Sequence, residues 1–338
     1  MDPVKILCSG ITPPGLQELI EWYYRDPEET EISEPWKFGE LFTKTDEFRK
    51  KLGREADSDK WSPLIDPFAP VKNISGIKFV TPMGLILANI DAVFNITRSL
   101  ASYLEPVDLT MLRYACILEE NNGGGEVQYL QYRRPNSIGW GLTGDKGTWS
   151  KSAINLERFN IKFGKSLDNK AKYKELIDDV LHRSPEGLDF VFVDTQDRIF
   201  GLGIAIEVLA VTGNLVARVD LEHPEYIYLA SKNFERVTLF KPVLSGNLGD
   251  AYLICEKRIE HIDNGFNELI LKPETPVKIS KNFKIWFDEF AEGFLSEQLE
   301  VWKTLEQALN GGVLEVPLYD LHQSIIVMKI PMFGDAGV

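Results

Sequence analysis

Apolar residues in the middle of the chain follow two patterns that alternate along the sequence. Short runs rich in β-branched and aromatic residues predict six strands, at 113–119, 137–144, 188–194, 214–221, 236–242 and 251–258. Segments whose apolar residues recur every three or four positions predict four helices, at 125–134, 170–183, 201–211 and 225–234. Strands that alternate with helices are typical of a mostly parallel sheet covered on both faces. The predicted fold class is therefore α/β.

The last two predicted strands are joined differently from the others. Only residues 243–250 separate them, which is too short for a crossover helix, so they should form an antiparallel hairpin at the edge of the sheet. A mostly parallel sheet that ends in such a hairpin is the plan of Rossmann-like methyltransferases. In sheets of this kind, ligands bind at the carboxyl ends of the strands.

The pattern changes upstream of this region. Residues 15–26 predict a helix within an otherwise irregular, charged segment, and residues 61–76, with three prolines, predict an extended connector. A helix is predicted over 81–104, with Thr81 at its N-cap and Pro82 as its first helical residue.

Downstream, residues 281–309 predict a long amphipathic helix that is ended by Gly311 and Gly312, and residues 324–333 predict a further strand. The helix could present a partner-binding face, or it could pack back on the sheet. The resulting domain organisation is an N-terminal extension (1–78), a central α/β domain (79–262) and a C-terminal helical extension (263–338) that packs on or beside it.

Composition is that of a soluble globular protein, with 44% hydrophobic and 26% charged residues. No apolar run reaches the roughly 18 residues of a membrane span, and no secretory signal is expected at the start. The three cysteines, Cys8, Cys116 and Cys255, do not form a disulfide framework, and the last two should be buried thiols. These features favour a location inside the cell, in the nucleus or cytoplasm, or in a viral factory if the protein is viral.

The formal net charge of −14 bears on the choice of partner. Proteins that bind polynucleotides through phosphates carry a basic face. The charge therefore favours a protein partner, excludes DNA, and leaves capped RNA open only if a local basic groove exists. The four histidines show no metal-ligand spacing among themselves or with the cysteines, so no metal site is predicted.

Six pieces of sequence carry a family resemblance. They are "SPLIDPF", "FVTPMGLILANIDAVF", "YLQYRR", "GWGLTG", "FNIKFG" and "FERVTLFKPVLSGNLGDAYLICEKR". In this order, over residues 61–258, they resemble the FtsJ-like RNA 2′-O-methyltransferases, especially the mRNA cap-1 enzymes. The resemblance implies a Rossmann-like methyltransferase fold that uses S-adenosylmethionine to methylate a ribose 2′-hydroxyl.

The family's catalytic set is lysine, aspartate, lysine and glutamate, with the second lysine as general base. By the resemblance, these positions fall on Ile86, Asp194, Arg218 and Asp250. Isoleucine offers no proton, and arginine cannot be deprotonated in proteins. Arg218 is therefore expected to form an ion-paired cluster with Asp194 and Asp250, and Ile86 is expected to be a core residue. An amine from Lys78 or Lys241 is the remaining route to a base.

The family's cofactor loop falls, by the same resemblance, on Asn122, Gly123, Gly124 and Gly125. The glycines allow close backbone approach, but Glu120 and Asn121 replace small residues just before them. Asp168 lies near the family's adenine-contacting acid. The loop thus predicts a weakened or empty pocket, with no cofactor expected, and S-adenosylmethionine only if the pocket is still open.

Three functions remain open at this point. The favoured one is a catalytically degenerate cap 2′-O-methyltransferase-like protein that acts as a non-catalytic subunit or scaffold. The second is an active methyltransferase with a rearranged site. The third is a sensor that binds the cofactor or a nucleotide without turnover.

Overall fold

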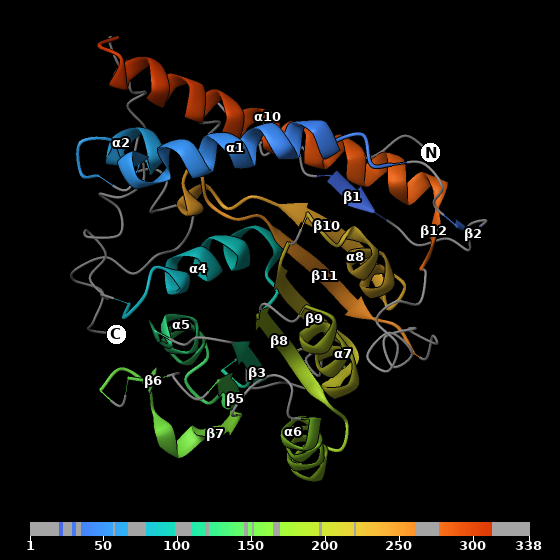
Figure 1. The fold of residues 1–338 in the computed structure, drawn as a ribbon. Helices are drawn as coiled ribbons and strands as arrows, with labels where there is room; N and C mark the ends of the chain where they lie inside the picture. Colours follow the sequence, from blue (N-terminus) through green and yellow to red (C-terminus); the bar gives the residue numbers. More distant parts are fainter. Residues whose placement is uncertain are drawn as a thin grey trace.

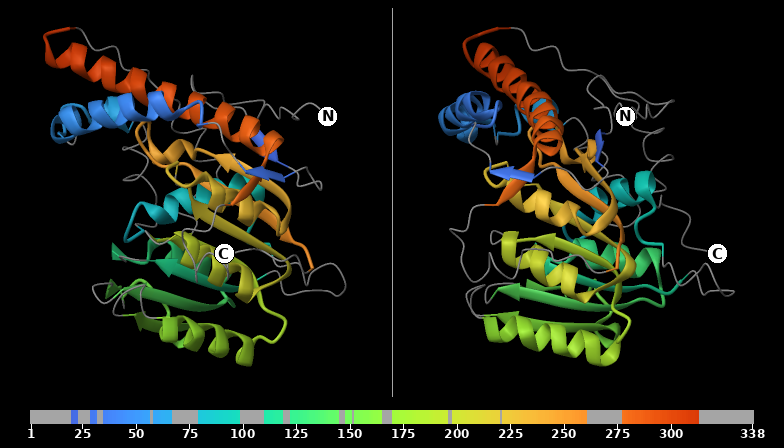
Figure 2. Two further views of the ribbon diagram at one scale, coloured as in Figure 1. Left: turned by 45° about the vertical axis from the view of Figure 1, so that its right-hand side comes forward. Right: turned by 90° about the vertical axis from the view of Figure 1, so that its right-hand side faces the viewer.

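The computed structural model describes residues 20–22, 29–31, 35–56, 58–66, 79–98, 110–118, 122–144, 148–150, 152–164, 170–195, 198–219, 221–260 and 277–312. A twisted eight-stranded sheet forms the centre of the molecule, and two long helices run side by side along one end of it (Figures 1 and 2).

The main sheet has the strand order β1-β10-β11-β9-β8-β3-β5-β7. Its strands are β1 (Ile20–Trp22), β3 (Arg113–Leu118), β5 (Ile138–Gly144), β7 (Phe159–Gly164), β8 (Leu188–Asp194), β9 (Leu209–Arg218), β10 (Phe234–Phe240) and β11 (Tyr252–Arg258). Strands β7, β5, β3, β8 and β9 are parallel neighbours, and β11, β10 and β1 follow in antiparallel pairing. The chain moves outward from β3 to β7 and then returns to continue from β8 on the other side. This is the doubly wound order with its switch point between β3 and β8, and it confirms the predicted Rossmann-like methyltransferase fold.

Helices of several lengths surround the sheet. They are α1 (Gly39–Ala56), α2 (Ser62–Ile65), α4 (Met83–Phe94), α5 (Gly125–Arg133), α6 (Lys170–Arg183), α7 (Arg198–Val208), α8 (Pro224–Ser231) and α10 (Lys281–Leu309), with the 3-10 turns η2 (Leu156–Arg158) and η3 (Val243–Ser245). Two small two-stranded sheets pair β12 (Lys278–Ser280) with β2 (Glu29–Glu31), and β4 (Asn122–Gly123) with β6 (Thr148–Trp149).

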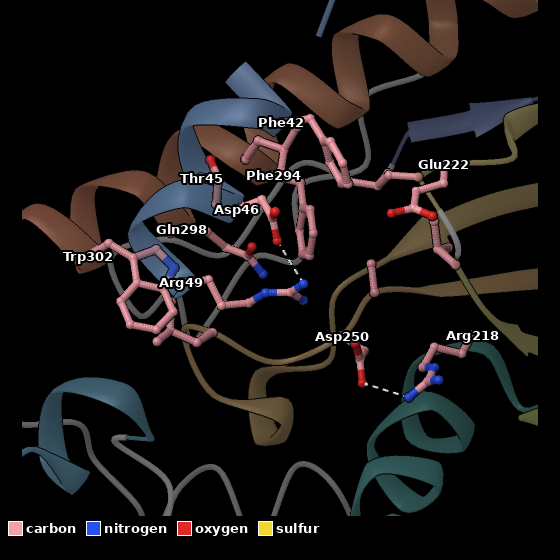
Figure 3. A pocket seen from close by; sticks show the side chains of 15 residues that line it. Phe42, Thr45, Asp46, Arg49, Arg218, Glu222, Asp250, Phe294, Gln298 and Trp302 are labelled. Carbon is pink, nitrogen blue, oxygen red and sulfur yellow. Dashed lines mark hydrogen bonds and ion pairs between the residues drawn. The ribbon is translucent and has the colours of Figure 1, made fainter. Parts of the chain in front are cut away.

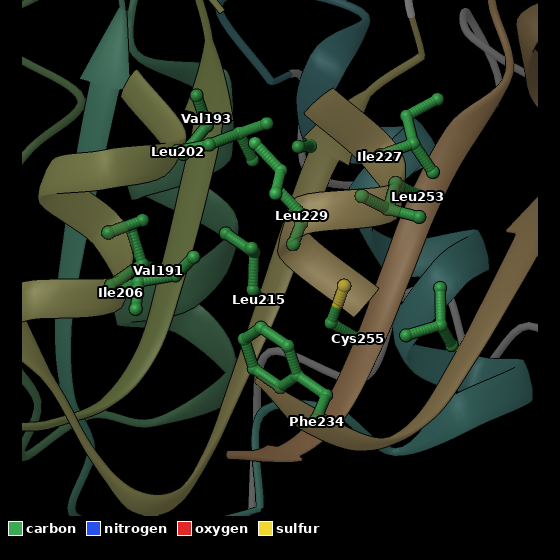
Figure 4. Packing of buried hydrophobic residues seen from close by; sticks show 14 of the residues in the cluster. Val191, Val193, Leu202, Ile206, Leu215, Ile227, Leu229, Phe234, Leu253 and Cys255 are labelled. Carbon is green, nitrogen blue, oxygen red and sulfur yellow. The ribbon is translucent and has the colours of Figure 1, made fainter. Parts of the chain in front are cut away.

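Alternation along the central strands divides the core between the two faces of the sheet. In β3, Ala115 and Ile117 join the buried cluster beneath α6, α7, α8 and α10, whereas Tyr114 and Cys116 join the cluster beneath α4 and α5. Figure 4 shows part of the first cluster, where α7 packs over β8 and β9 and α8 packs over β10 and β11. Because both faces are covered, the central strands are apolar at nearly every position, as expected for a parallel sheet.

The predicted hairpin is confirmed, since β10 and β11 pair antiparallel with Val237 opposite Cys255. Its place at the edge of the sheet is wrong, because β1 pairs antiparallel with β10 on the outer side, with Ile20 opposite Leu239. The helix expected over 15–26 is wrong for the same reason. Its central residues complete the hydrogen bonding of an edge that would otherwise be open, and this tertiary pairing overrides local helix propensity.

The charged segment upstream of residue 60 is not irregular, because it contains α1. Asp46 of α1 pairs with Arg49 at 2.8 Å and with Lys50 at 2.5 Å, which places opposite charges one turn apart. The buried side chains of Leu52 and Ala56 lie on another face of the helix. The connector over 61–76 is not extended throughout either, because it begins with the short helix α2.

The helix predicted over 81–104 is shorter than expected, since α4 begins at Met83 and ends at Phe94. Asn95 takes a left-handed conformation with φ 53°, which ends the helix. The carboxylate of Asp91 then accepts hydrogen bonds from the backbone N and the hydroxyl of Thr97. Pro82, not Thr81, is the N-cap residue.

The long C-terminal helix has the bounds that the sequence predicts. Phe283 and Phe287 of α10, and Phe38 before α1, belong to the same buried cluster as the residues of β8 and β9. The described parts of both terminal regions therefore contribute to the main core, while the domain boundaries at 78 and 262 stay a prediction.

Cys116 and Cys255 are buried free thiols, as predicted. The strand predicted over 324–333 lies outside the described residues, as do Cys8 and Lys78.

Within the described ranges, none of the helices combines the length and the apolar character needed to cross a bilayer.

Candidate functional site

Three of the four residues expected to form the degenerate catalytic set meet at one edge of the sheet. Asp194 ends β8 and Arg218 ends β9, and these two strands are parallel, so their carboxyl ends lie together. Asp250 precedes β11, in which Tyr252 pairs with Arg218 across the antiparallel ladder. The Arg218 Nε lies 3.1 Å from Asp194 Oδ1, and its Nη1 lies 3.5 Å from Asp250 Oδ2. A single guanidinium thus bridges both carboxylates.

The guanidinium of Arg218 keeps its positive charge. Burial on its own lowers the pKa of Arg218, but the charges of Asp194 and Asp250 outweigh burial and raise the pKa from its ordinary value. Arg218 therefore stays protonated at any physiological pH and cannot accept a proton from a hydroxyl group.

Ile86 is the fourth residue of α4, at the position where the resemblance places the family's first lysine, and its side chain is 9% exposed. It belongs to the buried cluster that includes Phe240 and Tyr252. The Tyr252 hydroxyl points toward Met83 of the same helix, with 3.6 Å between the oxygen and the sulfur. This side of α4 thus presents packing groups and supplies no amine.

The glycine loop packs closely against other parts of the chain. Asn122 and Gly123 form β4, and Gly124 caps α5 with φ 82°. A Cβ atom at Gly124 would lie 2.5 Å from Ile154 Cδ1 and 2.8 Å from Trp149 Cε3. The buried side chains of Ile154 and Trp149 therefore account for the glycine at this position.

Gly125 is constrained in the same way, because a Cβ atom there would lie 2.3 Å from the Thr81 Oγ1 and 2.6 Å from the Thr81 carbonyl oxygen. Protein atoms therefore occupy the side of Gly124 and Gly125 on which a side chain would lie. Asp168, Glu120 and Asn121 lie outside the described residues.

Glu126, the second residue of α5, is a member of the site that the sequence does not reveal. It is 3% exposed, and its Oε1 has no hydrogen-bond partner in the described part of the chain. Burial raises the pKa of Glu126 to about 7, its own backbone N–H opposes this, and the charge of Asp194 adds to the rise. A glutamate in the first turn of a helix normally indicates a solvated partner of the helix dipole, so sequence alone gives no sign of this burial.

Lys241, just after β10, is the other titratable group near the cluster. Its ammonium donates a hydrogen bond to the backbone oxygen of Asn247 and lies 5.2 Å from the centre of the Phe294 ring of α10. Burial lowers the pKa of Lys241 to about 8, although Glu297 and Asp250 oppose this. At physiological pH the amine is therefore still protonated in most molecules, and its contacts are with a carbonyl group and a ring, not with Asp194.

A cavity of about 580 Å³ opens next to the cluster. Arg218 and Asp250 line one side of it, and Asp46 and Arg49 of α1 line the other (Figure 3). Rings from α1 and α10, including Phe294, also face the cavity. The hollow thus lies between the strand ends and helices that belong to the two terminal regions.

In the ranges that the structure describes, no group of three or more histidine, cysteine or carboxylate side chains is placed to hold a metal ion. Arg218 itself occupies the space between the two nearest carboxylates.

No protein-family model and no curated protein matches the sequence. A putative hemolysin from Streptococcus thermophilus shares 12% identity at a TM-score of 0.37, over 68% of this chain and 78% of that chain. A probable spermidine synthase from Corynebacterium glutamicum shares 14% identity at a TM-score of 0.36, over 65% and 84% of the two chains. Human methyltransferase-like protein 13, in complex with SAH, shares 15% identity at a TM-score of 0.33, over 72% and 99%. Likeness at this level carries no argument about function, and the assignment of a Rossmann-like methyltransferase fold rests on the strand order.

Proposed function

We propose that this chain is a methyltransferase-fold protein that does not transfer methyl groups and acts by binding. It would serve as a non-catalytic subunit or scaffold, in an RNA-processing or capping assembly. The observation that carries the proposal is the bridging of Asp194 and Asp250 by Arg218 where the family resemblance requires a proton-accepting lysine.

The high pKa of arginine rules out Arg218 as a general base. An arginine with an ordinary or raised pKa is neutral in fewer than about one molecule in 10⁵ at pH 7. General-base catalysis needs a pKa near the working pH. Ile86 stands where the resemblance places the family's first lysine, so that amine is absent as well.

A methyl-transfer assay tests the proposal directly. The full chain is incubated with radiolabelled S-adenosylmethionine and capped RNA, alongside an active 2′-O-methyltransferase as positive control. We expect no label in the RNA above the protein-free blank. Label that depends on Asp194, lost in Asp194→Ala, would show instead that the chain is an active enzyme.

The second candidate is an active methyltransferase with a rearranged site, and Lys241 is the observation that favours it. Its pKa of about 8 is suitable for a general base, and Asp250 is close enough to affect it. If this candidate is right, Lys241→Met abolishes transfer.

The third candidate is a sensor. Calorimetry with S-adenosylmethionine and its demethylated product distinguishes it from the other two candidates. If neither ligand binds at millimolar concentration, the sensor function is excluded. Binding without transfer would support it over the scaffold.

A further inference from the structure

The side chain of Glu126 is buried at the start of α5. It is 3% exposed, and its Oε1 accepts no hydrogen bond from the described part of the chain. The backbone N–H of Glu126 itself stabilises the charged form, but burial outweighs this effect. A carboxylate placed here loses its hydration and gains too few donors in return. The surroundings therefore favour a neutral carboxylic acid.

The titratable groups that face Glu126 do not neutralise a negative charge. They are Tyr114 and Cys116 of β3 and Asp194 of β8. Burial raises the pKa of both Tyr114 and Cys116, so these two groups stay uncharged. The charge of Asp194 opposes ionisation of Glu126, while Asp194 itself is paired with Arg218.

Other segments packed against this end of α5 add no positive charge among the described residues. Residues 79–82, 148–150 and 152–155 are uncharged. On α4 the charged residue is Asp91, whose carboxylate accepts a hydrogen bond from Tyr129, further along α5. Arg133, at the end of α5, lies 3.5 Å from the same carboxylate. An ionised Glu126 thus has no cation to turn to while the helix stays in place.

Hydration of Glu126 requires the first turn of α5 to move. A Cβ atom at Gly84 would lie 2.6 Å from the carbonyl oxygen of Gly125, so α4 packs directly on the start of α5. A Cβ atom at Gly124 would lie 2.5 Å from Ile154 and 2.8 Å from Trp149. These contacts close the space around the carboxyl group on both sides, and they must separate before water can reach it.

The first turn of α5 is held less firmly than the turns that follow. It has no side-chain cap, and it begins at Gly124, whose φ is 82°. An exposed hydrogen bond of 2.9 Å joins the Val80 backbone N to Gln128 Oε1. The later turns are fixed by the buried hydrogen bond between Tyr129 and Asp91. The first turn can therefore separate while the rest of the helix keeps its place.

We propose that Glu126 is a proton-operated latch, whose neutral form keeps the first turn of α5 closed and whose ionised form releases that turn together with Gly123 and Gly124. The latch makes exposure of the glycine loop depend on pH. It goes beyond the binding function proposed above and does not depend on it.

The sign and the size of the effect follow from the two states of the turn. The pKa of Glu126 is about 7 in the closed turn and 4.5 once the side chain is in water. Because the open turn holds the proton more weakly, the equilibrium constant for opening rises with pH between these values and levels off above about pH 8. Between pH 6 and pH 8 it should rise about tenfold.

Amide hydrogen exchange of the full chain, resolved residue by residue, tests the latch. The Gln128 amide donates to the Gly124 carbonyl oxygen at 2.9 Å, so its exchange reports opening of the first turn. After correction for the intrinsic pH dependence of exchange, we expect the protection of this amide to fall about tenfold from pH 6 to pH 8. Low concentrations of urea should not accelerate it, because local opening exposes little surface, whereas amides of β8 exchange by global unfolding and respond to urea.

Glu126→Gln keeps the shape of the side chain and removes its titration. In this variant the protection of Gln128 should change less than twofold over the same pH range. Glu40→Gln is the matched control, because Glu40 is also the second residue of a helix, also follows a glycine, and is exposed. It should keep the full tenfold change.

Three results would overturn the proposal. The first is equal protection of Gln128 at pH 6 and pH 8 in the unmodified chain. The second is a tenfold fall that persists in Glu126→Gln. The third is a response to urea as strong as that of β8, which would mean that Glu126 ionises only when the whole chain unfolds. No methyl donor or partner is present in the experiment, so its outcome is separate from that of the proposed function.

Discussion

The Tyr129 hydroxyl of α5 donates a 2.8 Å hydrogen bond to Oδ2 of Asp91 in α4, and both side chains are buried. The same carboxylate accepts hydrogen bonds from the Thr97 backbone N at 2.9 Å and the Thr97 hydroxyl at 2.8 Å, and it lies 3.5 Å from Arg133 Nε. One buried charge thus ties the helix that carries Ile86 to the helix that follows the glycine loop.

Removal of this carboxylate should be costly. We expect Asp91→Ala to lower the free energy of unfolding by about 3–5 kcal/mol, because it leaves buried donors and the Arg133 charge without their partner. Tyr129→Phe removes only one of the hydrogen bonds and should cost about 1 kcal/mol. Urea unfolding of both variants checks this, and similar losses in the two would contradict the central role of Asp91.

Glu126 should make stability depend on pH. Its pKa is about 7 in the folded chain and 4.5 in the reference state, so the folded chain favours the protonated form. The stabilisation is complete below pH 4.5 and is lost as pH rises through 7. The measured quantity is the unfolding free energy of Glu126→Gln minus that of the unmodified chain. We expect this difference to rise by about 2–3 kcal/mol between pH 4.5 and pH 8. Parallel pH curves for the two chains in chemical unfolding would show that Glu126 is not buried as described.

Lys241 should make stability depend on pH in the opposite direction. Burial lowers its pKa to about 8 from 10.5, so the folded chain disfavours the charged amine. The penalty is full below pH 8 and disappears as pH rises toward 10.5. Compared with Lys241→Met, the unmodified chain should gain about 2 kcal/mol of unfolding free energy between pH 8 and 10. Thermal unfolding of both chains across that range gives the difference, and the prediction fails if the two respond to pH alike.

Arg218→Lys should not restore methyl transfer. Arg218→Lys returns an amine to the position of the family's second lysine, but the first lysine position is still Ile86, whose side chain offers no proton and no hydrogen bond. We expect the radiolabel assay to remain at the level of the blank. Transfer by this single variant would mean that an intact donor pocket exists and that only the base was lost.

Local patterns in the sequence were enough to predict the strands of the central sheet. The strand at 188–194 is apolar and short, and its neighbours in the sheet are set by alternation with helices. The ion-paired cluster was expected from the family resemblance, which places catalytic positions on Asp194 and Arg218, and these two residues end adjacent parallel strands. Ile86 was expected in the core because of its helical spacing, and it is buried there.

Features that depend on distant partners were missed. The strand at Ile20 forms by pairing with β10, and nothing near Ile20 in the sequence indicates this pairing. The helix α1 has a polar composition and is fixed by α10, through the hydrogen bond from the Lys37 backbone N to Asp288 and the contact between the Phe38 and Phe287 rings. The cavity beside Arg218 and Asp250 could not be predicted for the same reason, because its sides come from segments that meet only in the folded chain.

The pairing of β1 with β10 also has a consequence for biosynthesis. Ile20 leaves the ribosome about 220 residues before its partner Leu239. At about 5–20 residues per second, β1 waits about 10–45 seconds for β10 to be made. Throughout this interval β1 must avoid pairing with other polypeptides, because its own partner strand does not yet exist.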